Sequence, residues 1–299
     1  MKIGVLSFRS TDRKAAEEEI EIKRVALKMG HKCRIFRAKR FQMVYDQESP
    51  WLLYDGKPFP RCEVMITRPS VLVNVELHIA LVQQMEMAGI LLFNRYDAIS
   101  KAKNKIKTMQ ILDHYGIPIP KTVVTMRSND LAQAVKLVGG FPLIVKQPVG
   151  SYGVGVTIVE SMRTLQSFLL WDQPMYLLQQ YVKYSKGKDI RIFVVNGKVV
   201  GSMMRAAKKG EFRANIELGA KGQSVEITEE EAAIAIRCVQ ALDLNYGGVD
   251  LMRGSNGPVV LEVNSNPGFK ELERATGINI AEALVEYAVE YAERHMKKV

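Results

Sequence analysis

The chain has 299 residues, 47% of them hydrophobic and 25% charged, and it carries a formal net charge of +10. These values are typical of folded globular proteins and exclude a mainly disordered chain, and no apolar run reaches the about 18 residues of a membrane span. The positive charge attracts anions such as nucleotides, nucleic acid or acidic polypeptides, or it belongs to a solvated lysine-rich surface. Because no RNP motif, zinc finger or long basic tail is present, we expect neither a nucleic-acid partner nor a membrane partner.

The first third of the chain alternates predicted strands and helices. Strands are predicted at 3–7, 33–36, 64–67 and 91–94, and helices at about 20–27, ended by Gly30, and at 74–89. This alternation indicates a parallel sheet with helices on both faces. Residues 1–94 are therefore predicted to form an α/β domain.

Beyond residue 94 the pattern changes to shorter strands and hairpins. The predicted elements are a basic helix at 100–115, a strand at 122–125, a helix at 129–138 capped by Ser128, strands at 142–146 and 156–159, a hairpin over 190–204 turning at Asn196-Gly197, a helix from Thr228 to Leu242, a hairpin over 248–264 and a terminal helix from Ile280. Asn-Gly is a strong hairpin signal, and Thr228 with Glu231 forms a capping box.

The start of the chain and its cysteines favour a cytoplasmic location. The apolar run before Arg9 is too short for a signal peptide, and the three cysteines form no CxxC pair. The four histidines lack metal-ligand spacing. A disulfide framework, a zinc cluster and histidine-driven catalysis are therefore not expected, whereas a reducing cytosol is.

A glycine-rich loop lies between the strands at 142–146 and 156–159. Its residues are Gly150, Ser151, Tyr152, Gly153, Val154 and Gly155. Three glycines in this run let backbone N–H groups approach phosphate oxygens, while Tyr152 and Val156 exclude a Rossmann fingerprint and a Walker A loop. We interpret the loop as a hairpin that folds over a nucleotide's phosphates, with an ordinary flexible hairpin as the alternative.

Two lysines are candidates for contacts with the same phosphates. Lys146 stands beside Ile144 and Val145, which predicts a buried lysine, and buried lysines are rare unless paired. Lys105, on the basic helix, either points to the same place or lies on a solvated helix face. A further basic and polar cluster suits phosphate or carboxylate recognition, or forms a solvated basic loop. It consists of Asp189, Arg191, Arg205, Lys208, Arg213 and Asn215.

The most specific cluster is a set of oxygen donors on the hairpin over 248–264. Glu262 and Asn264 are two residues apart, so they share a face of their strand. With a three-residue loop at 255–257, Asp250 lies directly opposite Glu262, where two carboxylates repel each other unless a cation joins them. These donors, together with phosphate oxygens, suit Mg²⁺. A two-residue loop, Asn256-Gly257, would break this arrangement, and the alternative is a pair of exposed strand carboxylates.

Together these clusters resemble the ATP-grasp superfamily, and more narrowly the RimK-type α-L-glutamate ligases. The resemblance covers nearly the whole chain and rests on the order and spacing of its motifs. They are Lys105-Ile-Lys-Thr-Met-Gln110, Val145-Lys146, the glycine-rich loop, Gln179-Gln-Tyr181, Asp189-Ile-Arg191, the stretch from Arg205 to Asn215, Gly248-Val-Asp250, Glu262-Val-Asn264 and Asn266-Pro-Gly268. The resemblance implies an α/β ATP-grasp fold with a Rossmann-like parallel-sheet domain at 1–94, a central lobe with the glycine-rich loop at 95–182, and a C-terminal lobe with the Mg²⁺-binding hairpin at 183–299.

The resemblance also implies roles for individual residues. Lys105, Lys146 and the glycine-rich loop would bind the ATP phosphates, Gln180 and Tyr181 would lie at the adenine hinge, and Asp189 would lie near the ribose. Arg205, Arg213 and Asn215 would act at the reacting phosphoryl group. Asp250, Glu262 and Asn264 would hold one or two Mg²⁺ ions, which Mn²⁺ can replace.

Two positions depart from the family pattern. The hinge commonly has a glutamate where this chain has Gln180, and the family's His-Arg-Gly-Gly is here Glu217-Leu218-Gly219-Ala220. A backbone contact at the hinge would survive the first change. The second change concerns the acceptor or amino-acid site and not the ATP chemistry.

The implied activity is an ATP-dependent ligation of a carboxylate to an amine through an acyl phosphate, with release of ADP. Glutamate is the expected amino acid, and we expect a homo-oligomer. The acceptor is an acidic protein C-terminus, which the net charge favours, or a small molecule. A non-catalytic nucleotide- or RNA-binding protein is a third hypothesis, against which the intact Asp250, Glu262 and Asn264 argue.

Overall fold

Short apolar strands in parallel pairing build the N-terminal part of the chain. The computed structural model describes residues 1–8, 16–45, 52–69, 75–125, 130–148, 155–169, 176–185, 187–208, 214 and 219–297. The N-terminal sheet has the strand order β2-β1-β6-β7, and all its pairings are parallel, as predicted. Its strands are β1 (Lys2–Ser7), β2 (Lys32–Arg37), β6 (Val64–Arg68) and β7 (Leu92–Phe93).

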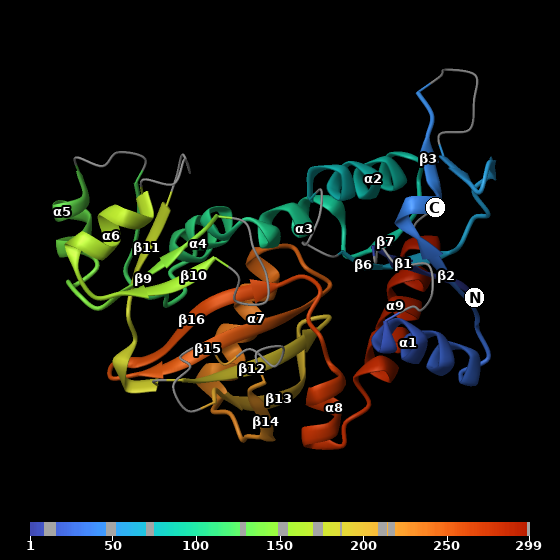
Figure 1. Ribbon diagram of the computed structural model, residues 1–299. Helices are drawn as coiled ribbons and strands as arrows, with labels where there is room; N and C mark the ends of the chain where they lie inside the picture. The colour runs from blue at the N-terminus through green and yellow to red at the C-terminus, as the bar shows by residue number, and fades with distance from the viewer. Residues whose placement is uncertain are drawn as a thin grey trace.

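Helices cover both faces of this sheet, as predicted (Figure 1). On one face, α1 (Glu17–Lys28) and α9 (Ile280–Met296) pack against Ile3 and Val5. On the other face, α2 (Val75–Met87) and α3 (Tyr96–Lys103) pack against Leu6. Successive side chains of a strand point to opposite faces, which explains why neighbouring residues of β1 belong to two different cores.

A small antiparallel sheet follows β2, and the sequence patterns do not predict it. Its strands are β3 (Phe41–Met43), β4 (Leu52–Tyr54) and β5 (Lys57–Pro58). Strands this short carry no readable periodicity. The rings of Phe36, Phe41, Tyr54 and Phe59 pack with centroids 4.9–6.3 Å apart, and this aromatic cluster holds the small sheet against β2.

The middle of the chain forms an antiparallel sheet with the strand order β10-β9-β11-β8. Its strands are β8 (Thr122–Thr125), β9 (Leu143–Lys146), β10 (Val156–Val159) and β11 (Tyr176–Gln180). Lys146 pairs with Val156, which confirms that β9 and β10 are adjacent antiparallel strands. One face of the sheet packs against α5 (Leu131–Leu137) and α6 (Met162–Leu169).

The single basic helix predicted at 100–115 is wrong, because the structure breaks it at Asn104. α3 ends at Lys103, and α4 (Lys105–His114) begins after one intervening residue. The side-chain oxygen of Asn104 accepts hydrogen bonds from the backbone N–H groups of Ile106 (3.0 Å) and Lys107 (3.1 Å). This N-cap starts a new helix with its own direction.

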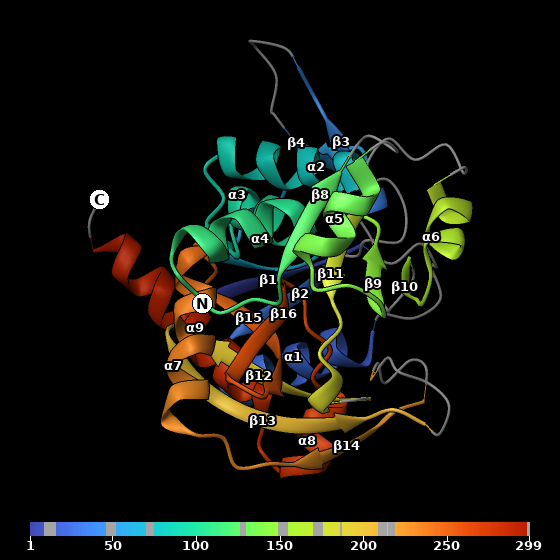
Figure 2. The ribbon, with the colours of Figure 1, turned by 90° about the vertical axis from the view of Figure 1, so that its left-hand side faces the viewer.

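The C-terminal part contains a larger antiparallel sheet with the strand order β14-β13-β12-β15-β16. Its strands are β12 (Lys188–Val195), β13 (Lys198–Ala206), β14 (Lys221–Ser224), β15 (Tyr246–Gly254) and β16 (Gly257–Asn264). The predicted Asn196-Gly197 turn joins β12 to β13, and the predicted capping box at Thr228 begins α7 (Glu229–Ala241). α4 lies over β16 (Figure 2) and shares an apolar core with α7 and one face of this sheet.

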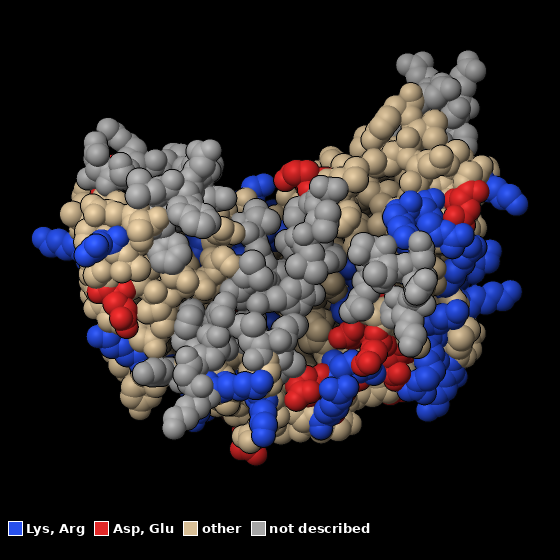
Figure 3. All heavy atoms as spheres, viewed as in Figure 1, with Lys and Arg blue, Asp and Glu red and all other residues tan. Residues whose placement is uncertain are grey.

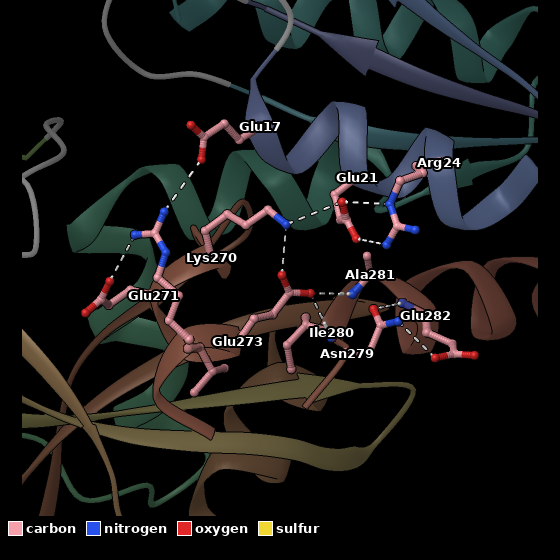
Figure 4. Close-up of polar contacts among 12 residues, drawn as sticks. Glu17, Glu21, Arg24, Lys270, Glu271, Glu273, Asn279, Ile280, Ala281 and Glu282 are labelled. Atoms are coloured by element: carbon pink, nitrogen blue, oxygen red, sulfur yellow. Dashed lines mark hydrogen bonds and ion pairs between the residues drawn. The ribbon is translucent and has the colours of Figure 1, made fainter. Parts of the chain in front are cut away.

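The N-terminal sheet and the C-terminal sheet share one continuous core. Phe93 of β7 stacks on Tyr246 of β15 with ring centroids 5.6 Å apart. Near the surface, α8 (Lys270–Thr276) contacts α1, because the ammonium group of Lys270 lies 3.6 Å from the carboxylate of Glu21 (Figure 4). The guanidinium of Arg274, on the same helix, lies 3.8 Å from the carboxylate of Glu17. The first and last thirds of the chain therefore pack as one unit. No described helix is long and apolar enough to cross a lipid bilayer.

Asn94 is the polar centre of this junction. Its buried side chain donates hydrogen bonds to the backbone oxygens of Tyr246 (2.9 Å) and Ser265 (3.2 Å). Its side-chain oxygen accepts hydrogen bonds from the backbone N–H groups of Asn245 (2.6 Å) and Tyr246 (3.1 Å). Four hydrogen bonds to backbone groups, three of them fully buried, therefore depend on one amide side chain.

Asn94→Ala should lower the free energy of unfolding by about 2–4 kcal/mol, because the variant leaves buried backbone groups without partners. Equilibrium denaturation in urea measures this loss. Asn256→Ala, in an exposed turn, is the matched control and should change stability little. Equal stability of the two variants would contradict the role of Asn94.

Candidate active site

The charged face of the C-terminal sheet holds the predicted metal ligands. Asp250 on β15 pairs with Glu262 on β16, as predicted. The predicted three-residue loop is wrong, because Gly254 pairs with Gly257 and only residues 255–256 form the turn. The correct pairing of the carboxylates therefore has a cause other than the loop length.

That cause is a β-bulge in β16. Leu251 pairs with Val260, so Leu261 is an extra residue on β16 that sets the two carboxylates opposite each other. The backbone N–H of Val260 donates a hydrogen bond of 2.8 Å to the oxygen of Pro118, in the segment that follows α4. The contact with this segment holds β16 at the bulge.

Asp250 is the centre of a buried network of two arginines and two aspartates. Arg191 donates hydrogen bonds to both oxygens of Asp250, through Nε (2.8 Å) and Nη2 (2.7 Å). Arg205 donates in the same way to Asp189 (2.7 and 2.8 Å), and its Nη2 also reaches Asp250 (2.6 Å). All four side chains are more than nine-tenths buried. The pairing on adjacent strands places them on one face of the sheet.

This network determines the ionisation of its carboxylates. Burial alone would raise the pKa of Asp250, but the positive charges of Arg191 and Arg205 outweigh burial and hold that pKa below its usual range. Burial raises the pKa of Asp189 to about 6, although Arg205 opposes this. Nε and Nη2 of Arg205 already donate to aspartates. If Arg205 contacts a phosphoryl group, as predicted, it would do so through Nη1.

Glu262 faces lysines. Within the described part of the chain, no hydrogen bond or ion pair involves its half-buried carboxylate. Burial lowers the pKa of Lys103 to about 7 and of Lys146 to about 8, and the negative charge of Glu262 opposes this in both cases. Burial also lowers the pKa of Lys105, again opposed by Glu262. Three lysines around one carboxylate give a region suited to a polyphosphate.

The N-terminus of α4 borders this lysine group. The backbone N–H of Lys105 donates to the oxygen of Pro148 (2.9 Å), just after β9. The first turn of α4 contains no acidic residue, although helix N-termini favour negative charge. Gly155 closes the base of the glycine-rich loop, since its oxygen accepts from the N–H of Gln147 (2.9 Å) and its φ is +74°. The base of the predicted phosphate loop therefore lies next to Lys105.

Gln180 and Tyr181 lie toward the other end of β9. Gln180 pairs with Leu143, at the start of β9, whereas Lys146 ends that strand. The separation is about 10 Å along the strand. The backbone N–H of Gln180 donates to the oxygen of Lys121 (2.8 Å), so the predicted hinge contact would use other backbone groups of this segment.

Several predicted site residues lie outside the described residues. They are Gly150, Ser151, Tyr152, Gly153, Arg213, Asn215, Glu217 and Leu218. The described residues that the structure brings together are Lys105, Lys146, Asp189, Arg205, Asp250, Glu262 and Asn264.

The predicted ligands fit Mg²⁺. Glu262 has no protein partner in the described ranges, and Asn264 on the same face of β16 adds an amide oxygen. Asp250 accepts three arginine N–H groups, which leaves one of its about four acceptor positions, on Oδ1. No group of three or more His, Cys, Asp or Glu among the described residues could hold a metal. Two carboxylates and one amide, completed by phosphate and water oxygens, match the preference of Mg²⁺.

Comparison with known proteins identifies the family. The family model described as RimK-like ATP-grasp domain matches residues 102–288, and that described as RimK PreATP-grasp domain matches residues 1–99. The chain belongs to the RimK-like ATP-grasp family. It is 36% identical over 290 residues to a "Probable alpha-L-glutamate ligase" of Methanococcoides burtonii, with 96% of this chain and 95% of that protein covered. It is 35% identical over 294 residues to a protein of the same name from Coxiella burnetii, with the same coverage.

Solved structures show the same fold. The ATP-grasp ligase PsnB complexed with a minimal precursor has a TM-score of 0.75 and 18% identity, covering 96% of this chain and 98% of that one. D-alanine–D-alanine ligase from Bacillus anthracis has a TM-score of 0.70 and 19% identity, covering 99% of each chain. This RimK-like protein therefore has the predicted ATP-grasp fold, and its family membership makes it an ATP-grasp amino-acid ligase.

Lys103 is the residue of this RimK-like site that the sequence patterns miss. The sequence patterns single out Lys105 and Lys146 but not Lys103, because they place residues 100–115 in a single basic helix. In the structure, Lys103 is half-buried at the end of α3, within electrostatic reach of Glu262. The available signal was a lysine directly before an asparagine, a common N-cap residue.

Proposed function

We propose that the chain is an alpha-L-glutamate ligase that uses ATP to join glutamate to a carboxylate acceptor. The observation that carries this proposal is the carboxylate of Glu262, which lies opposite Asp250, has no hydrogen-bond or ion-pair partner in the described part of the chain, and acts electrostatically on three lysines. This arrangement supports binding of a metal–polyphosphate complex. Relatives at 35–36% identity over nearly the whole chain are named probable alpha-L-glutamate ligases, and these names support glutamate as the amino acid substrate.

In the proposed reaction, ATP transfers its γ-phosphoryl group to the acceptor carboxylate and leaves ADP. The amine of glutamate then attacks the acyl carbon, the amide bond forms, and the bond to phosphate breaks. Lys103, Lys105 and Lys146 attract and orient the phosphates. Mg²⁺ held by Asp250, Glu262 and Asn264 would neutralise phosphate charge. Arg191 and Arg205 keep Asp250 ionised and fixed in position, so little reorganisation is needed during the transfer.

The nucleotide product tests this route. We expect ADP and phosphate to be released only when an amino acid and an acceptor are both present, and hydroxylamine to trap the activated carboxylate as a hydroxamate. Liquid chromatography separates ADP from AMP, and mass spectrometry identifies the amide. Release of AMP and pyrophosphate would point to an adenylating enzyme and would overturn the proposal.

For the acceptor we propose an acidic protein C-terminus, with a small molecule as the second candidate. Lys and Arg side chains gather on the side of the molecule that α1 and β2 occupy (Figure 3), and β2 is an edge strand of the N-terminal sheet. Exposed basic residues there include Lys28, Lys32, Arg34, Lys39 and Arg40. Such a surface would attract an acidic polypeptide. Among fold neighbours, PsnB was solved with a precursor peptide, whereas another is a D-alanine–D-alanine ligase, so the fold by itself allows both acceptor sizes.

A polypeptide acceptor should be captured more weakly at higher salt. Raising the ionic strength from about 0.01 M to about 0.15 M shortens the screening length from about 30 Å to about 8 Å. The apparent KM for an acidic peptide should therefore rise severalfold, while the KM for the amino acid changes less. The double variant Lys32→Glu/Arg34→Glu should weaken this salt dependence. A peptide KM that is indifferent to both changes would favour a small-molecule acceptor.

The predicted limits of the lobes (1–94, 95–182 and 183–299), the cytoplasmic location and the homo-oligomer stay predictions. So do the roles of the glycine-rich loop, Arg213 and Asn215, and replacement of Mg²⁺ by Mn²⁺.

A further inference from the structure

A group of unsatisfied polar atoms lies where the N-terminal sheet meets the loop after β16. Four buried side-chain atoms there have no hydrogen-bond partner among the described residues: Ser7 Oγ, Arg68 Nε, Ser265 Oγ and Asn266 Oδ1. Ser7 and Arg68 are paired residues at the carboxyl ends of β1 and β6. The carboxyl ends of parallel strands are where α/β sheets bind ligands. Since buried polar atoms nearly always have partners, this cluster is arranged for a bound molecule.

Contacts on both sides hold the cluster together. Arg68 Nη1 donates to the oxygen of Pro267 (3.1 Å), and Asn266 Nδ2 donates to the oxygen of Pro69 (2.9 Å). The second contact assigns Oδ1 of Asn266 as the free acceptor, because a carbonyl oxygen requires a donor. Gly248 lets the turn approach the sheet closely, since a Cβ at this position would lie 2.7 Å from the side chain of Pro267.

Arg68 has a buried positive charge that no acidic side chain of the described residues pairs with. It is only 5% exposed, and no described Asp or Glu lies within ion-pair distance of it. Its guanidinium instead lies over the ring of Phe269, 5.4 Å from the centroid. A buried charge is costly unless it is paired, and the planar guanidinium matches a carboxylate.

The cluster also borders the proposed phosphate region. The side chain of Lys103 is within electrostatic reach of both Arg68 and Glu262. Gly248 is two residues before Asp250 on β15 and shares its face of the sheet. A molecule bound by Arg68 would therefore lie next to the reacting groups.

We propose that Ser7, Arg68, Ser265 and Asn266 form the subsite for the amino acid substrate. Arg68 binds its α-carboxylate, which the reaction does not consume, and Asn266 Oδ1 accepts an N–H of its amine. The serine hydroxyls can donate to the carboxylate or accept from the amine. A cationic donor beside a neutral acceptor matches the two ends of an α-amino acid. This inference rests on the proposed ligase function. Of the two substrates that are joined, the amino acid and the acceptor, it assigns a binding site to the amino acid.

The test compares Arg68→Gln with the matched control Arg61→Gln, which changes an exposed arginine of the same sheet region. For each protein, steady-state kinetics yield KM values for glutamate, for the acceptor and for ATP. Arg68→Gln should raise the KM for glutamate about tenfold or more and change the KM for ATP less than about twofold, because a hydrogen bond to a charged group is worth such a factor. Arg61→Gln should change none of them.

A second arm compares glutamate with its α-amide, and its first measurement needs only the wild-type protein. Wild type should discriminate against the α-amide of glutamate by about tenfold or more in KM, and Arg68→Gln should lose most of this discrimination. An unchanged KM for glutamate in folded Arg68→Gln, a rise confined to the acceptor, an equal rise for ATP, or equal use of glutamate and its amide by wild type would each overturn the inference.

Direct binding separates this inference from the proposed function. Glutamate binding is measured by calorimetry with ADP and Mg²⁺ present, so that no amide has to form. Binding that Arg68→Gln weakens about tenfold would support the subsite even if no ligase product appears. Ligase activity with glutamate binding unaffected in Arg68→Gln would overturn the subsite and leave the proposed function standing.

Discussion

Glu262→Gln should reduce ligase turnover by about a hundredfold or more, with little change in stability. The variant keeps the size of the side chain and removes the negative charge that the proposed Mg²⁺ site requires, and loss of a well-placed polar group in an active site has effects of this size. No described hydrogen bond or ion pair is broken, so the free energy of unfolding should change by less than about 1 kcal/mol. ADP release and urea denaturation measure the two effects.

The contrast with Asp250→Asn sharpens this test. Asp250 accepts three charge-assisted hydrogen bonds in the arginine network, so its amide variant should lose both activity and stability. Glu286→Gln, on an exposed part of α9, is the control for a loss of charge and should lose neither. The Mg²⁺ concentration needed for half-maximal ADP release should rise in Glu262→Gln. Turnover near that of Glu286→Gln would show that Glu262 does not serve the metal.

Elements with a local chemical signal could be predicted from the sequence. The turn at Asn196-Gly197 and the capping box at Thr228 are specified by a few neighbouring residues, and both form as predicted. The parallel N-terminal sheet follows from the alternation of strands and helices. The break at Asn104 was missed because asparagine is weakly disfavoured within helices and common at their N-caps, so the spacing of apolar residues alone cannot decide between them.

The candidate site likewise combines features that could be predicted from neighbouring residues with features that depend on contacts distant in the sequence. The pairing of Asp250 with Glu262 could be predicted, but its cause could not, because the bulge at Leu261 accompanies a contact between β16 and Pro118, which is distant in the sequence. Arg68 is equally unpredictable from local pattern. Its position at the end of an apolar strand does not indicate burial, and only the contacts with Pro267 and Phe269, which lie between β16 and α8, show that its charge is buried.

Arg205→Met should lower the free energy of unfolding by about 3–5 kcal/mol, the typical cost of removing one partner from a buried ion pair. Arg205 supplies all the hydrogen bonds that Asp189 receives in this network and one of the three that Asp250 receives. Its loss leaves the carboxylate of Asp189 buried without a donor. Equilibrium denaturation at neutral pH measures the loss.

The double variant Arg205→Met/Asp189→Leu separates a missing interaction from an uncompensated charge. Replacing both partners by apolar side chains removes the buried charge that the single variant leaves behind, and such replacements are often neutral or stabilising. Asp250 keeps its bidentate contact with Arg191 in the double variant, so its own charge stays paired. The double variant should therefore recover at least half of the stability that Arg205→Met loses. If the effects of the two substitutions simply add, the instability of Arg205→Met has another origin, such as poor packing of methionine against β12. Asp189→Leu alone completes the cycle and should also be destabilised, because it leaves Arg205 buried with Asp250 as its remaining carboxylate partner.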